Sequence, residues 1–164
     1  MSERLRDELG AMLDAYDGVR RADEQRQRRA ESEGLAFLAG FAELRRTVVR
    51  PVFEAAGAIL KAHGHDFVIA EEEFVFGADG RASEAAIRLV ITPAGMASAA
   101  PTDAPRRELA FATRQYNRTV CITNGALPQP GSASGAAGGC TLAQIDTQLV
   151  EDHVLKLVAG LVRT

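Results

Sequence analysis

The amino-acid sequence predicts an α+β fold, in which a long N-terminal helical segment precedes an antiparallel meander of four to five strands and a C-terminal helix packed on the sheet. Apolar residues recur at helical spacing up to His63, at a period of two from Asp66 to Asn124, and at helical spacing again after Asp146. Helices and strands therefore occupy separate parts of the chain, which is typical of α+β proteins.

The composition predicts one domain. The chain has 164 residues, of which 46% are hydrophobic, and this is enough to form a single core.

A net charge of -3 does not attract nucleic acid, and no apolar run approaches the roughly 20 residues that span a bilayer. Because the N-terminus lacks a cationic start followed by an apolar run, we expect a cytoplasmic protein. The preference for arginine over lysine indicates a GC-rich genome, such as those of many bacteria.

Residues 2–19 carry a coiled-coil-like pattern. Apolar residues are separated there by steps of four, three, four and three, which places them on one helical face over about two heptads. We call this face the N-terminal seam, and it consists of Leu5, Leu9, Met12, Tyr16 and Val19. A projecting helix would leave such a face in contact with water, so we expect it to bind a second copy or another protein.

Residues 20–33 follow as a charged spacer without a large apolar residue. Five arginines and four acidic residues alternate along it, so it has no face to bury, and its mixed signs weaken any attraction for nucleic acid. We expect a solvated continuous helix, with a mobile linker as the alternative. Residues 1–33 would then form a projecting helical arm, and residues 34–164 a single α+β domain.

A broad apolar stripe resumes at helical spacing from Leu35 to Leu60, which predicts a helix packed on the core. Pro51 has no amide hydrogen and disfavours α geometry at the preceding residue. We therefore expect the helix to be kinked at Pro51, or a second helix to start there. Gly64 after His63 predicts a glycine C-cap.

Two hairpins are expected after this helix. The first pairs Asp66–Phe76 with Glu84–Thr92 through an Asp-Gly turn, and the second pairs Arg107–Tyr116 with Thr119–Asn124. Residues 93–105 are expected to form an exposed loop.

The C-terminal part begins with a glycine-rich segment, residues 127–139, which we expect to be a flexible loop. A short fifth strand is expected over Cys140–Ile145. Asp146 is a suitable N-cap for the final helix. The glycine-rich segment lacks the lysine and the spacing of a phosphate-binding loop, so we expect no nucleotide and no other cofactor.

Histidines and cysteines offer weak candidates for chemistry. His63 and His65 lie close together, but no matching ligand motif follows, so we expect structural roles and no metal. Cys121 and Cys140 are expected to be free thiols that act as small apolar side chains. No nucleophile elbow is present, and we therefore expect no catalytic residue.

The acidic run Glu71–Glu73 lies in a predicted strand, so Glu71 and Glu73 share one face and Glu72 occupies the other. Arg88, on the next strand, is the expected partner of these carboxylates. An alternative is a ligand-binding site formed by His65, Glu71, Glu73 and Arg88.

These patterns predict a non-enzymatic interaction or scaffold protein, which self-associates as a homo-oligomer or binds a protein partner through the N-terminal seam. The alternative is a small ligand-binding domain or enzyme with a polar pocket between the sheet and the helices. Neither nucleic acid nor a membrane is an expected partner.

Overall fold

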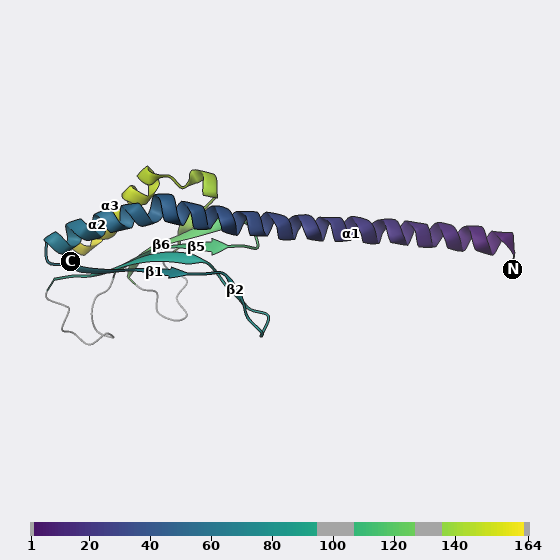
Figure 1. Ribbon diagram of the computed structural model, residues 1–164, viewed down its shortest axis with the longest axis horizontal. Helices are drawn as coiled ribbons and strands as arrows, with labels where there is room; N and C mark the ends of the chain where they lie inside the picture. The colour runs from purple at the N-terminus through teal and green to yellow at the C-terminus, as the bar shows by residue number, and fades with distance from the viewer. Residues whose placement is uncertain (1, 95–106, 127–135, 163–164) are drawn as a thin grey trace. The chain divides into compact units, whose positions relative to one another are not determined.

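The computed structural model describes residues 2–94, 107–126 and 136–162, and it has the expected α+β fold (Figure 1). The chain divides into two compact units, Met1–Ala36 and Phe37–Thr164. The predicted loop residues 95–105 and 127–135 lie outside the described residues.

Helix α1 runs without interruption over Glu3–Leu44. The charged spacer is therefore helical, and the alternative of a mobile linker is wrong. Side chains one turn apart form ion pairs along it, including Arg20 with Asp17 at 3.9 Å and Arg26 with Asp23 at 3.5 Å. These exposed pairs stabilise the helix only slightly. The helical conformation of the spacer therefore depends mainly on the good helix propensity of its residues.

Pro51 lies in the first turn of a separate helix, α2 (Arg50–Ala62), and this matches the alternative to a kink. The kink itself is not confirmed. A π-helical turn, η1 (Arg45–Val49), joins α1 to α2, and the Arg50 amide donates a hydrogen bond to the Arg45 carbonyl five residues back. Pro51 has no amide hydrogen, so it cannot donate a hydrogen bond to the preceding turn. The wider π-helical turn before it accommodates this missing hydrogen bond.

The π-helical turn also keeps one face of the helix on the core. Buried residues follow one another at steps of four: Phe37, Phe41, Arg45, Val49, Phe53 and Gly57. A step of four advances an α-helical face by about 40°, so a regular helix would carry this row away from the sheet. The wider turn of η1 reverses part of that drift.

Over the described residues, five strands form one antiparallel sheet in the order β1-β4-β5-β6-β7. Its strands are β1 (Asp66–Glu72), β4 (Ala86–Thr92), β5 (Arg107–Arg114), β6 (Thr119–Ala126) and β7 (Ala136–Cys140). The first expected hairpin is present but divided, because its distal part forms a separate pair, β2 (Val75–Phe76) with β3 (Ala82–Ser83). The second hairpin is present as expected.

The expected fifth strand at Cys140–Ile145 is misplaced. Strand β7 ends at Cys140, and a short 3₁₀ helix, η2 (Leu142–Gln144), follows it. Thr141 and Gln144 form a capping box at the start of η2, and these local hydrogen bonds compete with strand pairing.

Helices α2 and α3 (Thr147–Val162) lie on the same side of the sheet (Figure 1). The rings of Phe53 on α2 and Phe111 on β5 are 6.1 Å apart, at the centre of the core. Asp146 caps α3 as expected, since its carboxylate accepts a 2.8 Å hydrogen bond from the Leu149 amide. The C-cap at Gly64 is also present, with a φ of 85°.

Candidate functional site

The N-terminal seam lies on α1, and all of its side chains are 49–67% exposed. Leu13, which follows Leu9 by one helical turn, is equally exposed and widens the same face. The structure thus places an apolar strip of about two heptads in contact with water. Such a strip has the geometry of a helix-binding surface.

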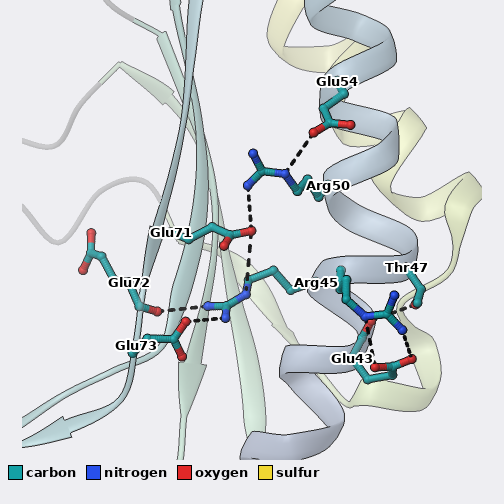
Figure 2. A network of polar contacts seen from close by, with 9 residues as sticks. Glu43, Arg45, Thr47, Arg50, Glu54, Glu71, Glu72 and Glu73 are labelled. Carbon is teal, nitrogen blue, oxygen red and sulfur yellow. Dashed lines mark hydrogen bonds and ion pairs between the residues drawn. The ribbon is translucent and has the colours of Figure 1, made fainter.

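A second candidate is a network of arginines and carboxylates between the helix and β1 (Figure 2). Arg45 projects from η1, is only 7% exposed and lies over the Phe41 ring. Its guanidinium contacts Glu73 at 2.5 Å and donates to the Glu72 carbonyl at 3.1 Å. The charge of Arg45 is therefore compensated by the end of β1.

Arg50 extends this network along α2. It contacts Glu71 at 3.0 Å and Glu54 at 2.9 Å (Figure 2). Hydrogen bonding to Glu71, followed by hydrogen bonding to Glu54, raises the pKa of Arg50 above its ordinary value. A hollow of about 630 Å³ adjoins both arginines, but the neighbouring carboxylates already bind them. The network therefore attaches the helix to the sheet edge.

Arg88 lies on the opposite face of the sheet and does not bind Glu71 or Glu73, so the expected cross-strand pairing with these two residues is wrong. Its guanidinium contacts Glu72 at 2.9 Å and Glu108 at 2.8 Å. Strand alternation explains the difference, because Arg88 pairs in register with Ala70 and so shares a face with Glu72. The hydrogen bond to Glu108 raises the pKa of Arg88, although burial acts in the other direction.

The four residues of the expected ligand site do not converge. Glu71 and Glu73 meet at Arg45, whereas Arg88 is on the other face. His65 lies at the start of β1, where its Nδ1 accepts a hydrogen bond from the Ala94 amide at 3.0 Å. The arrangement gives these side chains structural partners and no shared pocket.

The described residues contain no group of three or more side chains that could hold a metal ion.

Cys140 pairs in register with Val120, so it lies on the core face, while Cys121 lies on the opposite face. Both are free thiols, as expected. Burial, and secondarily the nearby Cys121, raises the pKa of Cys140, which lowers its reactivity.

Within the described part of the chain, no helix is long and apolar enough to cross a membrane.

A groove of about 480 Å³ between α2 and α3 is a site that the sequence reasoning missed. We call it the α2/α3 groove, and its apolar wall consists of Val48, Val52, Ala55, Ile59, Val154 and Leu155. Ile59 and Leu155 are 64% and 66% exposed at its edges. One signal was available in the sequence: the apolar stripe of this helix is wider than a single core-facing row, so some of it must remain outside the core.

His153 on α3 faces the core beside Phe111, with the two rings 6.1 Å apart. Among the described residues, its buried Nδ1 has no hydrogen-bond partner. Burial, followed by the charge of Lys156, lowers the pKa of His153. The lowered pKa favours the neutral form of the imidazole.

Comparison of the chain with protein-family models, curated proteins and solved structures finds no match.

Proposed function

We propose that this protein is a non-enzymatic interaction protein that associates through the N-terminal seam. The observation that carries the proposal is the exposure of all five seam side chains on one face of an uninterrupted helix. The polar groups expected to form a ligand site lie apart and pair with other residues instead, which favours an interaction protein over an enzyme.

The physical argument is the free energy gained by removing the seam from water. Burying a large apolar side chain completely stabilises by about 1.5–3 kcal/mol, and about half of this remains available at each half-exposed seam position. Association loses roughly 4–15 kcal/mol of translational and rotational freedom, which a partner with an apolar surface of its own can offset. The charged spacer keeps the following helical turns solvated, so the apolar contact is confined to residues 5–19.

The test replaces two seam residues with glutamate, in the double variant Leu9→Glu/Met12→Glu. We expect the wild-type mass to rise with concentration in size-exclusion chromatography with light scattering. The seam variant should associate at least about tenfold more weakly, because charged side chains resist burial.

The matched control is Ala11→Glu/Gly18→Glu, which adds the same charge to α1 on the side away from the seam. It should associate as the wild type does. A wild-type chain that stays monomeric at high concentration and captures no protein partner through the seam would contradict the proposal.

A further inference from the structure

We infer that the N-terminal seam pairs with the same seam of a second copy, and that the two helices run in opposite directions. This inference rests on the proposed function and identifies both the partner of the seam and its orientation. It is carried by the area that the pair buries, by the symmetry of the seam and by the charged residues that follow the seam on α1.

The seam and its neighbour Leu13 are large enough to form a dimer interface. Together they comprise six large apolar side chains in each copy, all of them 49–67% exposed. Burying such a side chain removes on the order of 100 Å² from water, so the pair buries about 1,200 Å² through these side chains alone. Stable interfaces bury roughly 1,200–2,000 Å². A second copy therefore supplies enough apolar area without a contact from the rest of the chain.

The helix that carries the seam is already formed. Helix α1 runs without interruption over Glu3–Leu44. A seam on a formed helix loses little conformational freedom when it pairs, whereas a disordered segment would first have to fold. This advantage offsets the shortness of the seam, which covers about two heptads.

The seam is symmetrical when two copies of the helix run in opposite directions. Leu5 of one copy then lies across from Tyr16 of the other, and Leu9 lies across from Met12. Each of these pairs occurs twice, once on either side of a two-fold axis between the helices. The two copies thus form four layers that contain only apolar seam residues.

The charged residues after the seam disfavour a parallel pair. The spacing of the seam continues along α1 to Asp23, Arg26 and Glu33. In a parallel pair, each of these residues would meet its own copy between the helices, where identical charges repel and lose their hydration. Asp23 and Arg26 instead form an exposed pair at 3.5 Å within one helix. A parallel pair would therefore have to separate directly after Val19, although α1 continues without interruption.

The antiparallel pair avoids these contacts. Helix α1 begins at Glu3, which lies across from Gly18 of the second copy, so the charged spacer lies beyond the start of the partner helix. Residues 20–33 then stay in water in both copies. A shift by one heptad would bring Leu5 against Asp23, and a shift the other way would leave the second half of the seam exposed. The spacer thus fixes the register as well as the orientation.

The acidic residues of this helix do not oppose the pairing. Residues 3–19 contain five acids and two arginines, which gives a net charge of -3. Three of the acids, Glu3, Asp7 and Asp14, lie on the side of α1 away from the seam, because each residue turns the helix by about 100°. The other two each contact an arginine one turn away on the same helix, at 2.8 and 3.9 Å. The acids beside the seam are therefore compensated within each copy.

Disulfide crosslinking in the full chain tests the orientation. One preparation carries Leu5→Cys and another Tyr16→Cys, and the two are mixed and oxidised. Peptide mapping separates the resulting crosslinks from any that involve Cys121 or Cys140. We expect the mixed disulfide between positions 5 and 16 to predominate, whereas a parallel pair would join each position to its own counterpart. Ala11→Cys, on the side away from the seam, should give neither product.

A second variant tests the role of the charged positions. Asp23→Leu/Arg26→Leu extends the apolar seam and leaves the net charge unchanged. In this background we expect a disulfide between position 5 of both copies to appear, because the charged residues no longer oppose a parallel pair. The control Arg21→Leu/Glu24→Leu adds two leucines at the same spacing outside the seam, and it should keep the disulfide between positions 5 and 16. An unchanged crosslink pattern in the first variant would overturn the assignment of orientation to these charges.

The outcomes separate this inference from the proposed function. If association depends on the seam but the wild type joins position 5 to position 5, the antiparallel pair is wrong and the proposed function stands. The same conclusion follows if the wild type stays monomeric but captures a different protein through the seam, or if light scattering gives a mass above that of two copies. A chain that neither associates nor captures a partner overturns both proposals.

Discussion

At the scale of single residues, two polar side chains lie in apolar surroundings, and the cost of burying their charge is met in different ways. Arg45 is paired with the Glu72 carbonyl at the end of β1 and with the carboxylate of Glu73, which follows that strand. His153 faces an aromatic ring, and burial favours its neutral form. A buried charge is tolerated only when it is paired, whereas a histidine can give up its proton.

His153 makes stability depend on pH. Its folded pKa lies below its ordinary value of 6.5, so the unfolded chain binds the proton more strongly. The stability that the neutral ring contributes is present above about pH 6.5 and is lost as the pH falls towards the folded pKa.

We expect His153→Phe, which keeps an aromatic ring beside Phe111, to remove this pH dependence. Urea unfolding at several pH values between about 5 and 8 measures it. The free energy of unfolding should fall more steeply with acidification in the wild type. His63 and His65 are present in both chains, so their effects cancel. Parallel curves would show that His153 does not contribute.

At the scale of elements, close packing of α2 on β1 depends on a missing side chain. Gly57 is buried, and the Phe67 ring occupies the space that a Cβ atom would need. Helices disfavour glycine by about 1 kcal/mol, and here the close approach of the two elements offsets that loss.

We expect Gly57→Ala to destabilise the protein by about 1–2 kcal/mol, because overpacking outweighs the gain in helix propensity. Thermal or urea unfolding measures the change. The smaller side chain of Phe67→Leu should relieve the clash, so the double variant should be more stable than the two single effects predict. Strict additivity would contradict the packing argument.

At the scale of the whole molecule, the hydrophobic core cluster is formed by residues of one of the two compact units, Phe37–Thr164. All residues of the core cluster lie at or after Phe37. Residues 1–36 carry the seam and the charged spacer and contribute no residue to the core cluster. The core is thus formed by the second unit, and the first unit carries the seam through which we propose that the protein associates.

Removal of residues 1–36 should separate these two properties. We expect the remaining chain to unfold cooperatively within a few degrees of the wild-type midpoint, because its core is intact. Its mass should no longer change with concentration, since the seam is absent. Loss of cooperative unfolding, measured by calorimetry, would show that the first unit is needed for the fold.

Local patterns in the sequence were sufficient for the α+β class, the helical spacer, the caps at Gly64 and Asp146, both hairpins and the spacing of the N-terminal seam. These features depend on contacts between near neighbours, which hydrophobic period and turn residues report directly. Only the tertiary structure decided the partners of Glu71 and Glu73 and the α2/α3 groove. Each of these depends on which faces of distant segments meet, and no local pattern determines that. The seam could be found from the sequence, whereas the α2/α3 groove forms only when α2 packs beside α3.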